Sequence, residues 1–387
     1  MQLSVIILNY NVRYFLELCV QSVQEAIENI SAEIIVVDNN SDDDSCQMMK
    51  SRFPNVKLIE NKGNVGFPKG NNIGVAHAQG EFICILNPDT VVAEDTFVKV
   101  LAYAKMKKKL GIIGVKLVDG RGNFLPESKR GVPTPFVAFS KMAGLYKLFP
   151  KSKLFGQYYA QHLGEDETGE VSILVGAFMM MQRELYVELK GFDENCFMYS
   201  DDIDLSYRSL LLDRTNFYFA DTKVIHFKGE STVKDGVYMK RFQDAMHFFY
   251  KKHFTVSWFF SLFMSLGIFL FSVLKKVQGQ KVEKKIIKES HIYSENKDLT
   301  KLFTLDHYKK VVFHDLKKEK MVISAAINDV VGSEIILDLN FITFKDGIDF
   351  MESLKNKGLT FRILPKNTNF LIGSDNSNER GEIIKIR

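Results

Sequence analysis

Four short apolar runs rich in β-branched residues recur in the first ninety positions, and helix-length segments separate them. The runs cover residues 3–8, 33–38, 56–60 and 81–86. Continuous apolar runs of this length are typical of parallel strands covered on both faces, because side chains in both directions are then buried. The pattern predicts βαβ units with helices near residues 14–28, 43–52, 69–78 and 94–108.

Polar residues follow these predicted strands where each strand ends. Asn9 and Asp38 follow the first two, and residues 61–64 and 87–89 follow the other two. In open α/β sheets this is the edge at which ligands bind. We therefore expect a ligand site here, although Asp38 and its neighbours could instead cap a helix.

Composition narrows the class of protein. The 387 residues suit a large α/β domain and a smaller one. The net charge of +4, without a basic stripe, argues against a nucleic-acid partner. The four cysteines form no CxxC pair, which indicates a reducing, cytosolic-side compartment. The N-terminus lacks a basic stretch, so we read it as a first strand and not as a signal peptide.

The chain divides into three predicted parts, which are residues 1–250, 251–290 and 291–387. Within the first part, "GVKLVDGRGNFLPESKRGVPTP" predicts loops or an acceptor-side flap. The block from residue 171 onward predicts a strand, a short helix, a loop, a helix and two strands. The third part predicts a small α/β domain of unknown role, with a helix at 345–357.

Residues 254–274 form an uncharged stretch of 21 residues with lysines on both sides. This stretch is long enough to span a bilayer. Basic residues at both ends give no clear orientation, so a re-entrant or in-plane helix on the cytoplasmic face fits better than a crossing. The alternative is a buried helix of the soluble domain.

Two loops carry residues suited to a nucleotide and a metal. In "NKGNVGFPKGNNIGVA", glycines allow close backbone approach, and Lys69 and the amides of Asn71 and Asn72 sit at a helix start that suits a diphosphate. The loop is neither a Walker loop nor a GxGxxG motif. In "ILNPDT", Asn87 and Asp89 can present hard oxygen ligands to Mg²⁺ or Mn²⁺.

Three aspartates cluster in "FMYSDDIDLSYR", where like charges raise one another's proton affinity. Ser200 can cap the helix that follows. Asp204 pairs with Arg208 across one helical turn. A helix cap alone would explain the cluster, although a merely solvated turn would gain nothing from placing like charges this close together.

These pieces, in this order, resemble the family 2 glycosyltransferases with the GT-A fold, and among them the rhamnosyltransferase-like branch. The resemblance rests on "ILNYN", "IIVVDNNSDD", "NVGFPKGNNIG", "LNPDT", "LVGAFMMMQRELYVELKGFDE", "DDIDLSYR" and "HFKGES", and covers about residues 1–235. It implies a nucleotide-binding, mostly parallel sheet with helices on both faces.

The resemblance also implies a role for each residue of the site. Asn9, Asp38, Asn64, Gly66, Lys69 and Asn71 would bind the nucleotide; Asp89, Asn87 and His226 would face the metal; Asp201, Gly191 and Phe192 would face the acceptor; and Asp202 would be the catalytic base. Many members have an aspartate where Asn87 stands, which lowers the expected metal affinity.

The implied reaction is an inverting sugar transfer with Mg²⁺ or Mn²⁺. The donor would be dTDP-rhamnose or, second, a UDP-sugar, and the acceptor a glycan or lipid-linked sugar at the cytoplasmic face of the cell membrane. The alternatives are a UDP-hexose transferase and an inactive nucleotide-sugar-binding homologue. A processive synthase fits poorly, because the only tryptophan, Trp258, is not part of a QxxRW motif. A nucleotidyltransferase should carry a phosphate loop after the first strand, where this chain has "NYNVRYF".

Overall fold

The computed structural model describes residues 1–142, 144–149, 152, 155–227, 236–254, 287–304, 310–318, 332–374 and 381–386. The first elements are β1 (Leu3–Asn9), α1 (Arg13–Ala26), β2 (Ala32–Asp38), α2 (Ser45–Arg52), β3 (Lys57–Glu60), α3 (Phe67–Ala76), β4 (Phe82–Leu86), β5 (Thr90–Val92) and α4 (Thr96–Lys105). The four predicted strands and four predicted helices are therefore confirmed, with small differences at their ends.

The next elements run to the end of the first sheet. They are β6 (Leu110–Val118), η1 (Pro126–Ser128), α5 (Pro135–Met142), α6 (Leu145–Leu148), η2 (Gly156–Tyr159), β7 (Gly169–Glu170), β8 (Phe178–Gln182), α7 (Arg183–Glu188), α8 (Asp201–Leu211), β9 (Thr215–His226) and α9 (Gly236–His253). Strands β1 to β9 make a nine-stranded sheet with the order β3-β2-β1-β4-β8-β6-β9-β5, in which β7 pairs with β9.

The sheet combines a parallel half with a mixed half. Strands β3, β2, β1 and β4 are parallel, whereas β8 runs antiparallel to both β4 and β6. Asn9 and Asp38 are partners at the last position of the β1–β2 register. The carboxyl ends of the parallel strands therefore lie at one edge, as the βαβ pattern predicts.

Two expectations for the mixed half were wrong. Residues 110–118 form the central strand β6, although the segment from Gly114 was expected to be loop. Lys116 obscured the pattern, because its ammonium is buried in this strand and pairs with carboxylates. Residues 215–226 form one strand, β9, and not two, since its pairing with β6 continues through a register shift near Lys116.

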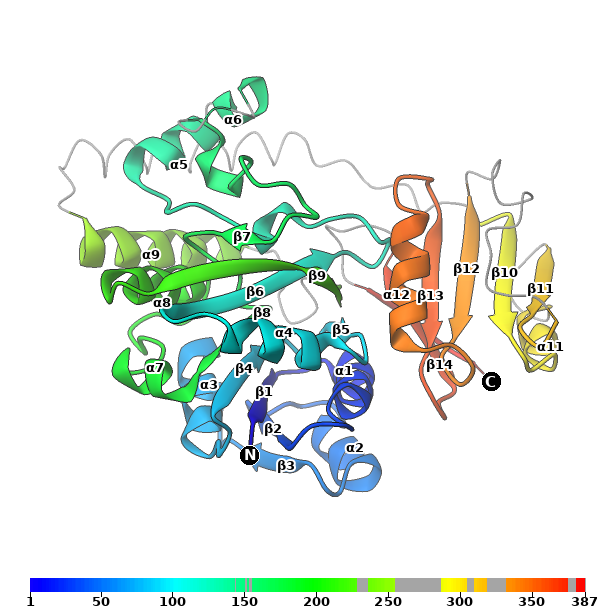
Figure 1. The fold of residues 1–387 in the computed structure, drawn as a ribbon. Coiled ribbons are helices and arrows are strands. Elements are labelled where there is room, and N and C mark those ends of the chain that lie inside the picture. The colour runs from blue at the N-terminus through cyan, green and yellow to red at the C-terminus, as the bar shows by residue number, and fades with distance from the viewer. Residues whose placement is uncertain are drawn as a thin grey trace.

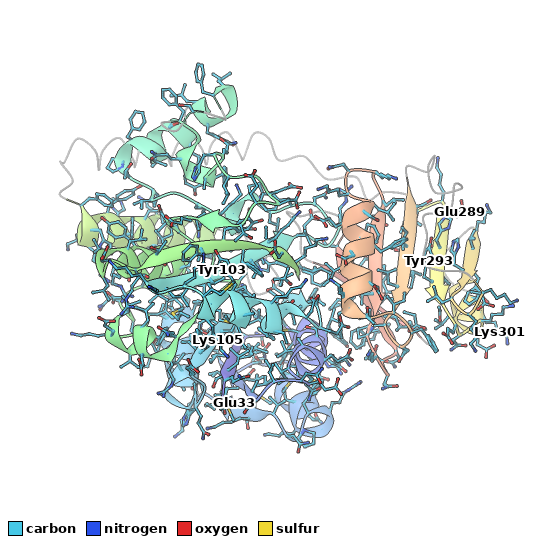
Figure 2. The ribbon with its side chains drawn as sticks, viewed as in Figure 1. Glu33, Tyr103, Lys105, Glu289, Tyr293 and Lys301 are labelled. Atoms are coloured by element: carbon cyan, nitrogen blue, oxygen red, sulfur yellow. The ribbon has the colours of Figure 1, made fainter. Side chains whose placement is uncertain are left out.

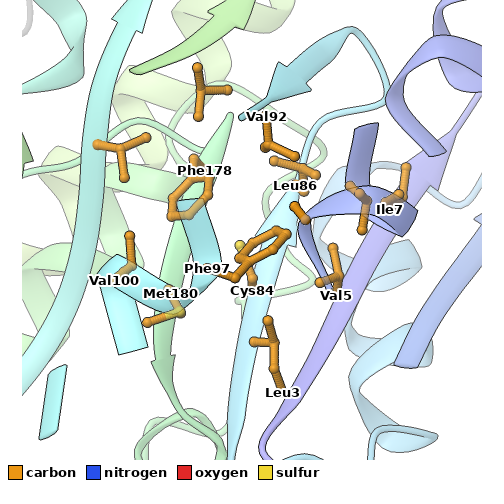
Figure 3. Packing of buried hydrophobic residues seen from close by; sticks show 14 of the residues in the cluster. Leu3, Val5, Ile7, Cys84, Leu86, Val92, Phe97, Val100, Phe178 and Met180 are labelled. Atoms are coloured by element: carbon orange, nitrogen blue, oxygen red, sulfur yellow. The ribbon is translucent and has the colours of Figure 1, made fainter. Parts of the chain in front are cut away.

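Both faces of the sheet are covered by apolar layers. On one face α1 and α4 pack over the strands, and Figure 3 shows Phe97 of α4 lying against side chains of β1, β4 and β8. On the other face α3 and α7 cover residues such as Ile6, Ile85 and Met179. A sheet buried on both sides explains why the sequence shows continuous apolar runs.

The C-terminal part forms a second sheet. Its elements are β10 (Glu289–Ser294), α11 (Leu299–Thr304), β11 (Val311–Asp315), β12 (Ser333–Asp338), α12 (Phe344–Ser353), β13 (Thr360–Leu364), β14 (Phe370–Ser374) and β15 (Glu382–Lys385), and the strand order is β11-β10-β12-β13-β14-β15. The expected small α/β fold, with a helix near 345–357, is confirmed.

The two sheets share an apolar core. Val12, Phe15 and Phe227 of the first sheet's domain lie in one cluster with Phe350 and Ile372 of the second. Figure 1 shows α12 between the two sheets, and Figure 2 shows side chains filling the space around it. The second sheet is therefore fixed to the side of the first.

Most of the uncharged stretch 254–274 lies outside the described residues, so the prediction of an in-plane helix stays a prediction. Among the helices that the structure does describe, none combines the length and hydropathy that a membrane crossing requires.

Candidate active site

The carboxyl ends of β1 and β2 hold a connected group of polar side chains. Asn9 Nδ2 donates to Asp38 Oδ1 at 2.7 Å. The same oxygen accepts from the Ser41 hydroxyl at 2.6 Å, and Asp38 Oδ2 accepts from Ser41 N at 2.8 Å. Asn9 and Asp38 are 0% and 2% exposed, respectively. The Asp38 carboxylate is thereby held in one orientation at the ligand-binding edge.

Asn39 joins this group to the glycine-rich loop, and sequence reasoning missed it. Its Nδ2 donates to the Gly66 carbonyl at 3.2 Å and to Asn64 Oδ1 at 3.3 Å, and its Oδ1 accepts from Asn61 Nδ2 at 2.9 Å. The sequence signal that could have identified Asn39 is its position directly after Asp38, at the end of a strand. The loop around residues 61–66 is therefore fixed to the end of β2.

The other predicted nucleotide residues lie on α3. Lys69 is exposed in the first turn. Asn71 is fully buried in the second turn, where its Nδ2 donates to the Phe67 carbonyl at 2.9 Å. The sequence had suggested that Asn71 lies at the start of this helix. Helix α3 begins at Phe67, however, so Asn71 lies beyond the helix start. Its Oδ1 has no hydrogen-bond partner within the described part of the chain.

The three predicted metal-side residues lie together. His226 Nε2 is 3.4 Å from Asp89 Oδ1 and 3.4 Å from Asn87 Nδ2. The pairing of β5 with β9 sets this geometry, since it places Thr90 opposite His226. Asp89 is 5% and His226 7% exposed, and His226 Nδ1 has no partner among the described residues. An oxygen ligand, an imidazole and an amide that can be turned to present its oxygen fit a divalent cation.

Asp201 and Asp202 open helix α8 and are 7% and 8% exposed. Asp202 Oδ2 accepts from Arg130 Nη2 at 2.5 Å and from Gly176 N at 3.1 Å. Its Oδ1 accepts from Ile203 N at 2.7 Å. Burial, together with the neighbouring Asp202 charge, raises the pKa of Asp201 to about 7.

The cap of α8 differs from the expectation. Ser200 occupies the N-cap position, but its hydroxyl lies 3.2 Å from the Cys196 sulfur and makes no capping bond to the described helix amides. The pair of Asp204 with Arg208 is confirmed at 2.7 Å. Lys252 and His253 of α9 also contact the Asp204 carboxylate, at 2.8 and 2.6 Å.

Arg130 is a residue of the candidate site that sequence reasoning did not identify. It lies in the segment read as a flap, where nothing in the local pattern separates it from other basic residues. In the structure its guanidinium binds both Asp202 and the Leu174 carbonyl, the latter at 3.2 Å. The ion pair is largely buried, so Arg130 holds Asp202 in place and balances its charge.

Two consecutive residues before β8 connect Asp202, the predicted base, with the predicted metal-side residues. Gly176 N donates to Asp202, and the Ala177 carbonyl accepts from Asn87 N at 3.0 Å. The glycine-rich loop also contacts this region, because Phe67 N donates to the Phe197 carbonyl at 3.1 Å. The predicted nucleotide, metal and base residues therefore surround one part of the sheet edge.

Gly191 and Phe192 are both buried, so they do not form an exposed binding surface in this structure. Phe192 is 1% exposed, and its ring packs against Phe67 and Tyr186. Asn72 Oδ1 accepts from Phe192 N at 3.0 Å and lies 2.5 Å from the Cβ that an alanine at Gly191 would carry. These two residues shape the loop before α8, and their predicted contact with an acceptor stays a prediction.

The family model found in comparisons with known proteins matches the N-terminal part of the chain. Residues 4–189 match the family model "Glycosyl transferase family 2". The chain is 27% identical over 244 residues to the N-acetylglucosaminyl-diphospho-decaprenol L-rhamnosyltransferase of Mycobacterium tuberculosis, covering 60% of this chain and 78% of that protein. It is 26% identical over 219 residues to the rhamnosyltransferase WbbL of Escherichia coli, covering 53% and 78%.

Two solved glycosyltransferase structures align with about two thirds of this chain, at low TM-scores. A Staphylococcus aureus TarS fragment with UDP-GlcNAc has a TM-score of 0.44 at 18% identity, over 66% of this chain and 68% of that one. The mannosyltransferase PcManGT of Pyrobaculum calidifontis, with GDP-Man and Mn²⁺, has a TM-score of 0.43 at 19% identity, over 63% and 61%.

The nine-stranded α/β sheet carries polar residues at the carboxyl ends of its parallel strands, which is the edge where proteins with open α/β sheets bind their ligands. Over residues 4–189 the chain matches the family 2 glycosyltransferases, and its sequence is rhamnosyltransferase-like.

Proposed function

We propose that the protein transfers a sugar with inversion from a nucleotide sugar to a glycan or lipid-linked acceptor in cell-surface polysaccharide synthesis. Rhamnose is the first candidate for the sugar, and a hexose from a UDP-sugar is the second. The observation that carries the proposal is the Asp202 carboxylate, which Arg130 and Gly176 N hold in place while the next residue, Ala177, accepts a hydrogen bond from Asn87 of the metal-side group. The reaction of two named relatives, both rhamnosyltransferases, supports the choice of sugar.

In this proposal, Asp202 takes the proton of the acceptor hydroxyl. Among the described residues, two donors occupy Oδ2, whereas Oδ1 accepts from one backbone amide, so Oδ1 would be the atom that receives the proton. The acceptor oxygen forms its bond to the anomeric carbon as the bond from that carbon to the diphosphate breaks. The electron pair of the broken bond stays on the leaving nucleoside diphosphate.

The nucleotide and its diphosphate would contact different residues of the sheet edge. Asn9 and Asp38 would bind the nucleoside, and Asn64, Gly66, Lys69 and Asn71 would line the rest of the cleft. Asp89, Asn87 and His226 would hold Mg²⁺ or Mn²⁺, which when bound neutralises charge on the diphosphate. The site would work at the cytoplasmic face of the cell membrane, close to lipid-linked acceptors.

A thermal-shift panel of nucleotides and nucleotide sugars tests donor binding, with and without Mn²⁺, on wild type and Asp89→Ala. A ligand at a hundredfold excess over its Kd stabilises the folded state by about 2.7 kcal/mol. We expect a dTDP- or UDP-sugar to raise the wild-type Tm only with metal, and the variant to show no such rise. If no nucleotide sugar shifts either protein, the proposed transferase is contradicted, whereas a shift without any sugar transfer would favour the inactive nucleotide-sugar-binding homologue.

The variant Asp202→Asn separates binding from chemistry. We expect it to keep the donor-dependent Tm shift and to lose transfer by about 10²-fold or more, because an amide cannot accept the hydroxyl proton. Turnover equal to wild type would remove Asp202 from the role of base.

A further inference from the structure

A protruding segment lies next to the proposed base. Residues 131–160, here called the α5–α6 excursion, leave the domain after Arg130 and return before Ile173. Arg130 and Ile173 form an isolated bridge in which each amide donates to the other's carbonyl at 2.9 Å. Gly131 N donates to the Gln157 carbonyl at 2.9 Å, which closes the base of the excursion. Figure 1 shows α5 and α6 standing outside the body of the domain.

The excursion carries a continuous apolar surface. Phe136, Leu148 and Phe149 are 43%, 70% and 52% exposed. The rings of Phe136 and Phe149 both pack on Phe155, with centroid distances of 6.0 and 5.5 Å. Figure 2 shows ring-bearing side chains pointing outward from this region. We call Phe136, Leu148, Phe149 and Phe155 the aromatic patch; contiguous exposed apolar groups of this kind mark an interaction surface, unlike scattered ones.

The charge of the segment points to an anionic partner. Residues 128–164 contain no aspartate or glutamate, whereas residues 131–164 contain four lysines. Aromatic and aliphatic side chains combined with lysines are typical of segments that lie in the headgroup region of a membrane. Each lysine near an anionic lipid surface contributes about 1 kcal/mol of attraction.

The position of the excursion relates this surface to the rest of the chain. The Tyr250 hydroxyl of α9 donates to the Pro133 carbonyl at 2.7 Å, and Ala138 packs on the same cluster as Tyr250 and Phe254. Phe254 is the first residue of the uncharged stretch 254–274. That stretch therefore begins at the base of the excursion.

The same base adjoins the proposed catalytic carboxylate. Ile203, the residue after Asp202, belongs to the cluster that contains Tyr250, and Arg130 both begins the excursion and binds Asp202. A surface that contacted the excursion would thus lie on the acceptor side of Asp202.

We propose that the α5–α6 excursion docks on an anionic lipid bilayer through the aromatic patch and so holds a lipid-anchored acceptor beside Asp202. The inference rests on the proposed function, because it specifies where the lipid part of the acceptor would be. The patch enters the headgroup region, the positive charge of the segment is attracted to the anionic surface, and the anchor of the acceptor approaches the site along the same plane.

A tryptophan placed in the patch reports directly on lipid contact. In the full-length chain, Trp258→Phe removes the only native tryptophan, and Phe149→Trp introduces a reporter. The probe is a vesicle of brominated phosphatidylcholine mixed with an equal amount of phosphatidylglycerol. We expect the emission to shift to shorter wavelength and to be quenched, and both effects to weaken in high salt. Val187→Trp in the same background is the matched control, because Val187 is 63% exposed elsewhere on the domain and has acidic neighbours, and it should show neither effect.

Two outcomes would overturn the inference. An emission unchanged by vesicles would show that the patch does not meet lipid. An emission that is already shifted to short wavelength without vesicles would show that another part of the chain, such as the stretch 254–274, covers the patch.

A second set of variants separates this inference from the proposed function. Phe136→Ser/Leu148→Ser/Phe149→Ser should lose transfer to a lipid-linked acceptor in vesicles by tenfold or more, yet keep the donor-dependent Tm shift and transfer to a short-chain soluble acceptor. Equal loss on both acceptors would contradict docking. If the wild type itself binds no nucleotide sugar, the proposed function fails, whereas the fluorescence result remains valid.

Discussion

At the scale of single residues, Asp201 and Asp202 have different environments although they are neighbours. Arg130 and Gly176 N neutralise and orient the Asp202 carboxylate. Asp201 is desolvated and faces the charge of Asp202, which raises its pKa to about 7. Neighbouring carboxyl groups in different environments can take distinct roles in one site.

The raised pKa of Asp201 has a consequence for stability. Because the folded-state pKa of about 7 exceeds the ordinary 3.8, the folded protein binds the extra proton between these values. The stability that this group contributes is therefore complete below the unfolded-state pKa and is lost as the pH rises through the folded-state pKa.

We predict that Asp201→Asn increases the Tm relative to wild type at pH 8, with little difference near pH 4. The asparagine is neutral at every pH, so the variant avoids the cost of a buried charge, which is of the order of a few kcal/mol. Scanning calorimetry at several pH values measures the difference. Asp204→Asn is the control and should lower the Tm at neutral pH, because Asp204 is paired with Arg208, Lys252 and His253. A Tm difference for Asp201→Asn that is independent of pH would contradict the raised pKa.

At the scale of secondary-structure elements, the loop between α7 and α8 positions the start of α8. Gly191 has a φ of 66°, a conformation that favours glycine. Arg208 Nη2 donates to its carbonyl at 2.8 Å, which ties the loop to the same helix that carries Asp201 and Asp202. The turn at Gly191 therefore helps to hold the start of α8, and with it Asp201 and Asp202, in position.

We predict that Gly191→Ala lowers the free energy of unfolding by roughly 1–3 kcal/mol, because the new Cβ meets Asn72 Oδ1 and the φ is unfavourable. Gly63→Ala is the matched control, since a Cβ there meets nothing within 4 Å, and it should stay within about 0.5 kcal/mol of wild type. Urea unfolding followed by circular dichroism compares the two. Equal midpoints for both variants would show that the loop adapts to the side chain.

At the scale of the whole molecule, charged contacts reinforce the shared core between the two sheets. The Lys116 ammonium, buried in β6, lies 2.5 Å from Glu352 of α12 and 2.5 Å from Asp166. Lys223 of β9 also contacts Glu352 at 2.5 Å. Among the described residues, Glu165, Asp166 and Glu352 form a group of acids close enough to bind a metal, but the ammonium of Lys116 already occupies that position.

We predict that Glu352→Gln lowers the free energy of unfolding by about 1–3 kcal/mol in one cooperative transition, because the variant leaves Lys116 buried with less charge compensation. Asp298→Asn removes an exposed pair with Lys301 and should have little effect. Urea titrations followed by hydrogen-exchange mass spectrometry, which reads peptides of each sheet separately, test this. If the two sheets gave separate transitions, with only one moved by Glu352→Gln, the sheets would unfold independently.

The shared core also changes how membrane association must be tested. Removing every residue from Phe254 onward would delete the uncharged stretch, but it would also expose Phe15 and Phe227, which pack against the second sheet. Substitutions within the full chain are therefore the sharper experiment.

Local patterns were enough to predict the parallel half of the fold. The runs ending at Asn9, Asp38 and Leu86 became parallel strands, because apolar β-branched stretches of this length must be buried on both faces. The motifs around Asp89 and Asp202 also allowed the site residues to be named. These features depend on residues that are close together in the sequence.

Only the tertiary structure decided which distant residues complete the site and how the two sheets are joined. Arg130 reaches Asp202 across 72 positions, and Lys116 reaches Glu352 across 236. The energy of a buried ion pair depends on distance and desolvation in space, neither of which leaves a periodic trace along the chain. For the same reason β6 was misread as a loop, since a lysine in a central strand is acceptable only when another part of the chain supplies its carboxylate.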